Sequence, residues 1–334
     1  MTHCKALDTL KAARREGTAA TLAALVGAGI DRALPLPGSG HTLERWRVLA
    51  EVAAIDLSLI KLFEGHTDAL AIRAELGAGA SPPGALWGTW CAEPPDARLS
   101  ARPAGQGGLV LDGVKAWCSG AAELTHAVVS CWNEAGEPCL ATVALDQNGI
   151  HLDARNWHAV GMEQTGSLDI RFSAARALPL GRPGDYVRRP GFWHGGAGIA
   201  ACWFGGALGV ARRTRELLAD GDPDPHRLAH LGSIDIAVAG AAAALRACAA
   251  GIDAKPADDA RTPALRVRLI VEQAAESVMR HAARALGAGP LCRDARFARA
   301  MADLPVYLRQ SHAERDLAAL GQSVLREESA SWTL

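Results

Sequence analysis

Residues Asp112 to Ala121 read DGVKAWCSGA, and this stretch decides how the middle of the chain folds. Its first two residues lie between two short apolar runs, Leu109–Leu111 and Val114–Trp117. An Asp-Gly pair between such runs is typical of the two-residue turn of a β-hairpin. The sequence therefore predicts a hairpin that turns at Asp112-Gly113.

Trp117 and Ser119 lie two residues apart at the end of this stretch. Side chains two residues apart on a strand point to the same face, so we expect an indole face and a hydroxyl side by side. A core tryptophan beside a strand-end serine is the alternative interpretation, because tryptophan is usually largely buried.

Further short apolar runs follow this stretch, with Asn, Gly and Asp turn residues between them. They lie at Ala127–Trp132, Cys139–Leu145 and Leu168–Phe172. Closely spaced short strands of this kind predict a small barrel or sandwich.

Helical patterns flank the β region on both sides. Before it, an apolar face recurs at helical spacing from Thr42, a candidate N-cap, to Ile60. After it, Gly195–Ala211 is a long apolar run, and Val267 to Ala282 again keeps helical spacing up to Gly287. The order predicts an α+β fold with an N-terminal helical domain (1–85), a small central β-barrel domain (86–185) and a C-terminal helical bundle (186–334).

Composition excludes several classes of protein. The 334 residues include 35 Lys+Arg and 36 Asp+Glu, which leaves no charge excess to neutralise a nucleic-acid backbone. Hydrophobic residues make up 49% of the chain, which disfavours disorder. We expect a globular protein that does not bind nucleic acid.

Cysteines and apolar segments bear on the compartment. The eight cysteines form no C-x-x-C pair and no zinc-type cluster, so we expect neither a disulfide framework nor a metal site. Met1 to Leu10 has no apolar leader segment, and Gly195–Ala211 is shorter than the roughly 20 residues of a membrane span. We expect a buried helix there, no membrane and a cytoplasmic location.

Three motifs in order resemble one enzyme family. Gly88–Pro94 reads GTWCAEP, the opening stretch reads DGVKAWCSGA, and Gly161–Phe172 reads GMEQTGSLDIRF. Within a helix–barrel–helix chain they resemble the acyl-CoA dehydrogenase superfamily of flavoproteins and the flavin-dependent monooxygenases that share its fold. The resemblance implies bound FAD, held between the barrel and the C-terminal helices.

The resemblance also assigns candidate cofactor residues. Trp117 would cover the flavin ring, and Ser119 stands where the family has a threonine that reaches the ring edge. The strand and turn residues that would hold the flavin are Trp90, Cys91, Ala92, Trp117, Cys118 and Ser119. Thr165 and Ser167 would contact cofactor phosphate or ribose, or else satisfy the backbone of a turn. Gly287 and Gly289 would allow close approach of the pyrophosphate, although a helix end explains Gly287 equally well.

The catalytic base does not follow the family pattern. Where many members have Glu-Gly, this chain has Ala302-Asp303, so Asp303 is one residue out of register. The monooxygenases of this fold carry a histidine near His312, which has Ser311 and Glu314 close by, and histidine serves as an acid or base near neutral pH. His66 is a further candidate, although a structural histidine is the alternative interpretation there as well as at His312.

The resemblance implies an FAD-dependent oxidoreductase of the acyl-CoA dehydrogenase type, acting on the CH–CH group of an acyl thioester or a related substrate. The thioester would be carried on CoA or on a carrier protein, and an electron-transfer partner or oxygen would accept the electrons. The alternatives are a flavin-dependent monooxygenase of the same fold and a degenerate, non-catalytic binding protein. The apolar Gly195–Ala211 helix predicts a homodimer or homotetramer.

Overall fold

The computed structural model describes residues 8–10, 17–326 and 332. Most of Met1–Leu10, where we expect no apolar leader segment, therefore lies outside the described residues. The described chain packs into two compact units. The first, here called the barrel unit, comprises the described residues up to Leu36 together with Ser58–Phe192. The second, the helical unit, comprises Pro37–Leu57 and the described residues from Trp193 onward. The three-domain division stays a prediction.

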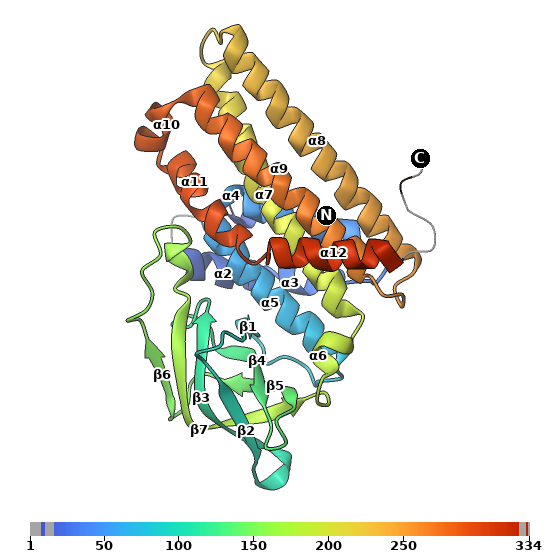
Figure 1. The fold of residues 1–334 in the computed structure, drawn as a ribbon. Coiled ribbons are helices and arrows are strands. Elements are labelled where there is room, and N and C mark those ends of the chain that lie inside the picture. The colour runs from blue at the N-terminus through green and yellow to red at the C-terminus, as the bar shows by residue number, and fades with distance from the viewer. Residues whose placement is uncertain (1–7, 11–16, 327–331, 333–334) are drawn as a thin grey trace. The chain divides into compact units, whose positions relative to one another are not determined.

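The barrel unit is built around a small closed sheet (Figure 1). Strand β4 pairs in parallel with β2. From β2 the antiparallel pairs are β2–β3, β3–β7 and β7–β5. β5 also pairs antiparallel with β4, which closes the sheet. β1 extends the sheet from β4, and β6 pairs with β7. The strands are β1 (Trp87–Trp90), β2 (Leu99–Pro103), β3 (Leu109–Cys118), β4 (His126–Trp132), β5 (Pro138–Ala144), β6 (Ile150–Asp153) and β7 (Leu168–Leu180). The predicted small barrel is confirmed.

Helices complete the barrel unit. They are α2 (Thr18–Gly27), α3 (Ile30–Ala33), α5 (Leu57–Glu75) and α6 (Asp185–Arg188). One apolar cluster joins α5 to the sheet through Ile72, Trp87 and Val128, which are at most 2% exposed. Burial of such large side chains stabilises the unit by about 1.5–3 kcal/mol each.

The predicted hairpin at Asp112-Gly113 is wrong. Both residues lie inside the continuous strand β3, at an irregularity in its pairing with β7. Gly113 has φ +126°, and a Cβ there would lie 2.2 Å from the carbonyl oxygen of Arg98. The Asp112 carboxylate accepts the backbone N–H of Ala174 on β7 at 2.7 Å. The Asp-Gly pair therefore forms a bulge that β2 and β7 stabilise, because both neighbouring strands bond to it.

The expected common face for Trp117 and Ser119 is also wrong. Trp117 has φ +57°, in a second irregularity between Lys115 and Cys118, and β3 ends at Cys118. Trp117 is 60% exposed, whereas Ser119 is 9% exposed. Strand alternation applies only to regular extended backbone, and the left-handed residue breaks it.

In the described residues, the helical unit contains α4 and the helices that follow α6 (Figure 1). They are α4 (Thr42–Ile55), α7 (Gly191–Ala219), α8 (Pro225–Ala254), α9 (Arg261–Leu286), α10 (Ala288–Arg293), α11 (Ala295–Leu308) and α12 (Glu314–Arg326), of which α7 begins two residues before the unit. Thr42 is the first residue of α4 rather than its N-cap. Its N–H and hydroxyl both bind the Asp253 carboxylate of α8, at 3.0 and 2.6 Å, so a distant side chain satisfies this helix end.

The glycines of α7 allow it to pack closely against α4. A Cβ at Gly205 would lie 2.1 Å from the carbonyl oxygen of Ala50, and one at Gly209 would lie 2.6 Å from that of Ala54. The predicted buried helix at Gly195–Ala211 is confirmed, because its inward residues are at most 9% exposed and Trp203 is 0% exposed. Its small residues serve packing inside the unit, so they no longer argue for a subunit contact.

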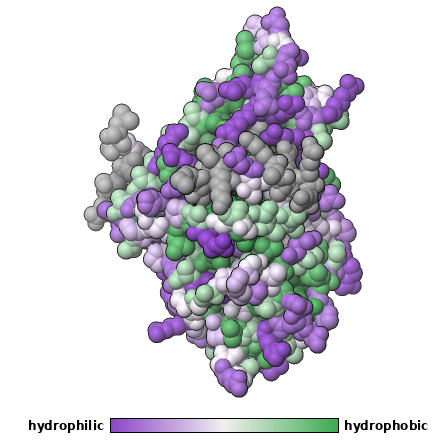
Figure 2. Space-filling model, turned by 180° about the vertical axis from the view of Figure 1, so that it is seen from behind, coloured by the Kyte–Doolittle hydropathy of each residue, from purple (hydrophilic) through white to green (hydrophobic). Residues whose placement is uncertain are grey.

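The exposed apolar helix is α8 instead. Among the described residues it is the one helix long and apolar enough to cross a membrane by length and composition, which is weak evidence for a span. Only 17% of its most apolar window is buried, and Ile236 is 75% exposed. Hydrophobic and hydrophilic residues are interspersed on the face shown in Figure 2.

Candidate functional site

A buried charged cluster lies where the first two motifs meet in the barrel unit. Lys115 of β3 is 2% exposed, and its ammonium donates to Glu93 Oε1 and to Ser130 Oγ, each at 2.5 Å. Ser130 also donates to Glu93, and Trp132 Nε1 donates to Glu93 Oε2 at 3.0 Å. Burial alone would raise the pKa of Glu93, but these three donors lower it. The cluster ties β3 and β4 to the segment that follows β1.

Three hydroxyls connect the second motif to the third. Ser119 Oγ and Ser167 Oγ are 2.8 Å apart, and Thr165 Oγ1 is 2.8 Å from Ser167 Oγ. Thr165 donates its only hydroxyl proton to the carbonyl oxygen of Met162. Ser167 must therefore donate to Thr165, and Ser119 to Ser167. These hydrogen bonds support a structural role for Thr165 and Ser167 in the turn. The hydroxyl proton of Ser119 is donated to Ser167 and is not available to a ligand.

The residues around this chain of hydroxyls differ in accessibility. Trp90 is 3% exposed, and its Nε1 donates to the carbonyl oxygen of Ser119 at 3.1 Å. Cys91 and Ala92 follow β1 and are half-buried, whereas Cys118 is 0% exposed. Burial raises the pKa of the Cys91 thiol to about 11 and also raises that of Cys118, so both stay protonated near neutral pH. Cys118 offers a ligand its backbone rather than its sulfur.

His66 is bonded through both ring nitrogens. Nδ1 accepts the backbone N–H of Trp87 at 3.0 Å, and Nε2 lies 3.4 Å from Asp31 Oδ2. The ring is 1% exposed. Burial alone would raise the pKa of Asp31, but the hydrogen bond from His66 lowers it. These bonds support the structural interpretation of His66, which links α5 and α3 to the start of β1.

The helical unit holds the other catalytic candidates, which lie on α11, on α12 and in the turn between them. His312 is 57% exposed, and its Nδ1 lies 3.5 Å from Asp316 Oδ1. Ser311 is 5% exposed and donates to Glu272 Oε2 at 2.6 Å. Asp303 is 3% exposed on α11, and Glu314 is exposed in the first turn of α12. His312 and Glu314 are accessible from this unit's surface, whereas Asp303 is not.

The two candidate pyrophosphate glycines lie at a helix end. Gly287 has φ +69° and its N–H bonds the carbonyl oxygen of Ala283 at 2.9 Å, so it terminates α9. Gly289 follows within α10. A Cβ at either position would meet nothing within 4 Å. The helix-end interpretation explains Gly287, and a cofactor role for both stays a prediction.

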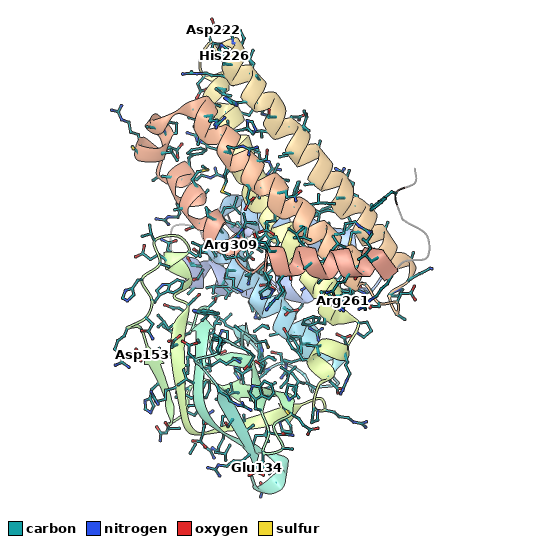
Figure 3. The ribbon with its side chains drawn as sticks, viewed as in Figure 1. Glu134, Asp153, Asp222, His226, Arg261 and Arg309 are labelled. Carbon is teal, nitrogen blue, oxygen red and sulfur yellow. The ribbon has the colours of Figure 1, made fainter. Side chains whose placement is uncertain are left out.

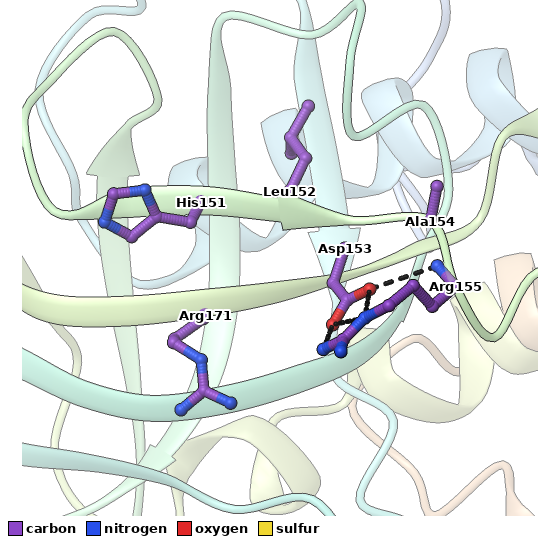
Figure 4. Close-up of a pocket in the computed structure, with 6 residues that line it drawn as sticks. All are labelled: His151, Leu152, Asp153, Ala154, Arg155 and Arg171. Carbon is purple, nitrogen blue, oxygen red and sulfur yellow. Dashed lines mark hydrogen bonds and ion pairs between the residues drawn. The ribbon is translucent and has the colours of Figure 1, made fainter.

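A shallow pocket on β6 and β7 has a volume of about 580 Å³ (Figure 4). It is lined by His151, Leu152, Asp153, Ala154, Arg155 and Arg171. The Asp153 carboxylate is bound by the Arg155 guanidinium, which holds the pKa of Asp153 far below its usual range. The pocket contains no predicted site residue. Among the described residues, no group of three or more His, Cys, Asp or Glu could hold a metal ion.

Sequence reasoning missed several residues that hold the candidates in place. Lys115 and Glu93 belong to the second and first motifs, but no local sequence pattern indicates that their side chains pair across 22 residues. Glu272 lies 39 residues from Ser311, beyond any local signal. Asp316 is four residues after His312, a spacing at which side chains meet on a helix, so that pair could have been noticed.

The chain is similar to solved structures over nearly its whole length. TdsC from Paenibacillus sp. A11-2, solved with FMN and indole, has a TM-score of 0.82 and 18% identity, and covers 96% of this chain and 95% of its own. KijD3, solved with FMN and an amino-keto dTDP-sugar, has a TM-score of 0.82 and 19% identity, covering 98% and 94%. Methanesulfinate monooxygenase MsuC from Pseudomonas fluorescens has a TM-score of 0.77 and 22% identity, covering 97% and 95%.

No protein-family profile matches the sequence, and a search of curated proteins gave no match. At these identities the structural likeness defines the fold, and the protein has the acyl-CoA dehydrogenase-like fold that the motifs predict. A fold hosts many reactions, so activity has to be argued from the residues.

Proposed function

We propose that this protein is a flavin-dependent monooxygenase in which His312 acts as the general acid or base. The observation that carries the proposal is the pairing of an exposed His312 with Asp316, together with an alanine at position 302. Asp303 is 3% exposed, so it is poorly placed to take a proton from a substrate. This favours oxygen chemistry over the acyl-CoA dehydrogenation that the motifs suggest first.

The barrel unit carries residues that fit a flavin. Trp117 presents a large aromatic side chain that is 60% exposed, at a position where the backbone leaves the regular strand. Covering such a surface with a flat ring would remove apolar area from water. Trp117, together with the backbone of Cys91, Ala92 and Cys118, would hold the ring. Ser119 would offer an oxygen lone pair, because its proton is engaged with Ser167.

Once reduced by an external reductant, the flavin would supply two electrons and two protons, so that one oxygen atom of O₂ enters the substrate and the other leaves as water. TdsC and KijD3 were solved with FMN, which makes FMN the first cofactor to test and FAD the second. The substrate would be a small molecule with an oxidisable heteroatom, in line with the sulfur substrate of MsuC. His312 would move a proton to or from that substrate.

The experiment reconstitutes the protein with FMN or FAD and first records any rise in melting temperature. Flavin that bleaches with an external reductant, stays oxidised with acyl-CoA and reoxidises with oxygen supports the monooxygenase. His312→Ala should then lower kcat about 10²–10⁴-fold with unchanged flavin affinity. Bleaching by simple acyl-CoAs that survives His312→Ala would instead establish the dehydrogenase.

We also propose that α8 forms a contact with a second copy of this chain. It is mostly exposed and apolar, and a long apolar helix left in water is unfavourable. Light scattering at micromolar concentration should give a dimer or tetramer, and Ile236→Glu should shift it toward monomer. A monomeric wild type contradicts the proposal.

The proposed location is the cytoplasm.

A further inference from the structure

The turn that carries His312 is anchored to α9 by a buried carboxylate. Glu272 is 6% exposed, and both of its oxygens are bonded. Oε1 accepts from Arg309 at 2.7 Å, and Oε2 accepts from the Ser311 hydroxyl at 2.6 Å. Ser311 Oγ in turn accepts the backbone N–H of Ala313 at 3.1 Å. Glu272 of α9 therefore binds Arg309 and Ser311 directly, and through Ser311 it also fixes Ala313 on the other side of His312.

A second anchor lies one helical turn earlier on α9. Arg268 is 8% exposed and donates to the carbonyl oxygen of Gln310 at 3.0 Å and to that of Gly196 at 2.9 Å. Its guanidinium also lies 4.7 Å from the ring centre of Trp203. Arg309 marks the start of this turn in Figure 3. Residues 309–311 thus all bind α9 side chains.

Asp316 holds His312 itself. Oδ2 accepts the backbone N–H of His312 at 3.0 Å, and Oδ1 lies 3.5 Å from the ring Nδ1. A carboxylate at Nδ1 favours the tautomer that carries its proton there, which leaves Nε2 as the proton acceptor. Ala313 has φ +44°, an unfavourable conformation for alanine that persists only where surrounding bonds hold it.

We propose that Glu272 and Asp316 are positioning residues for His312, Glu272 through Ser311 and Asp316 directly. Glu272 fixes the turn, and Asp316 sets the tautomer and direction of the ring. Ser311, a catalytic candidate on sequence grounds, then acts by holding the turn rather than by touching substrate. The functional meaning rests on the proposed role of His312, but the positioning itself can be measured without turnover.

The experiment compares Glu272→Gln, Ser311→Ala and Asp316→Ala with the matched control Glu276→Gln. Glu276 lies one turn further along α9, is 55% exposed and also contacts Arg309, at 3.3 Å. Hydrogen exchange of the peptide spanning residues 309–316 should become about tenfold faster in Glu272→Gln and Ser311→Ala, because a buried bond is lost. It should stay unchanged in the control. Ser311→Ala keeps the test decisive if Glu272→Gln fails to fold.

Nitrogen-15 NMR of His312 in the flavin-free protein gives the second measurement. The neutral ring should carry its proton on Nδ1 in the wild type and shift toward Nε2–H in Asp316→Ala. Unchanged exchange in Ser311→Ala, or an unchanged tautomer in Asp316→Ala, overturns the inference whatever the activity. With flavin bound, the three variants should lower kcat at least tenfold with little change in KM. If exchange and tautomer change as expected while His312→Ala keeps full activity, the positioning stands and the proposed function fails.

Discussion

Removing the negative charge of Glu93 should destabilise the protein more than removing its partner, Lys115. The Lys115 ammonium is 2% exposed and has two bonded partners, Glu93 and Ser130. Glu93→Gln leaves that ammonium buried without a counter-charge. Breaking a buried pair in this way costs about 3–5 kcal/mol. We expect a loss near the lower limit, about 3 kcal/mol, because glutamine keeps a carbonyl oxygen that can accept one bond.

The reverse change leaves a group that water can reach. Lys115→Met puts an apolar side chain of similar length into the barrel, and Glu93, whose side chain is 33% exposed, keeps Ser130 and Trp132 as donors. We expect a loss of about 1 kcal/mol, the usual cost of one net hydrogen bond. The double variant should lose about 1–2 kcal/mol, less than the sum of the single losses, because no buried charge remains.

Urea unfolding of the flavin-free protein, followed by circular dichroism, measures the three free energies. Thermal midpoints should fall by roughly 6 °C for Glu93→Gln and roughly 2 °C for Lys115→Met, taking about 2 °C per kcal/mol for a large chain. Equal losses in the two single variants, with a double variant that equals their sum, would falsify the argument. That result would mean that the ammonium is solvated or that the pair contributes no coupling.

Three further predictions concern pH, His66 and the α7 glycines. The folded pKa of Glu93 is lowered, so the stability that its ionised carboxylate contributes is present above the unfolded pKa of about 4.3 and is lost as the pH falls through the folded pKa. The difference in unfolding free energy between wild type and Glu93→Gln should therefore narrow as the pH falls below about 5 in urea titrations, and a constant difference contradicts this. His66→Ala should lower the unfolding free energy by about 2–4 kcal/mol, since the buried Asp31 carboxylate and the Trp87 N–H then lose their bonds to the ring. The kcat per folded, flavin-loaded molecule should stay within about twofold of wild type. A large fall in kcat without a loss of stability would indicate that His66 is catalytic. Gly205→Ala should lower the unfolding free energy by about 2 kcal/mol or more, because the added methyl group forces α7 away from Ala50. On the same helix, a Cβ at Gly196 meets nothing within 4 Å, so Gly196→Ala should be neutral or stabilise by up to about 1 kcal/mol. Equal shifts of the melting temperature in the two variants would show that α7 and α4 are not closely packed.

The amino-acid sequence by itself determined the helix–barrel–helix order and the positions of several strands and helices. Strands β4 and β5 and helices α7 and α9 follow from local apolar periodicity, a property that neighbouring residues set among themselves. The three ordered motifs indicated the acyl-CoA dehydrogenase-like fold, which the structural comparisons confirm. The same motifs placed acyl-CoA dehydrogenation ahead of oxygen chemistry, because a motif identifies a scaffold more reliably than a reaction.

Tertiary structure alone decided what the individual side chains do. Asp112-Gly113 has the composition of a turn, yet it forms a bulge because β2 and β7 bond to it from both sides. The Ser119 proton is used by Ser167, 48 residues away, and the His312 turn is anchored by Glu272 of another helix. A polar group that leaves water takes whichever partner the packed fold brings within about 3 Å, and sequence distance does not enter that choice.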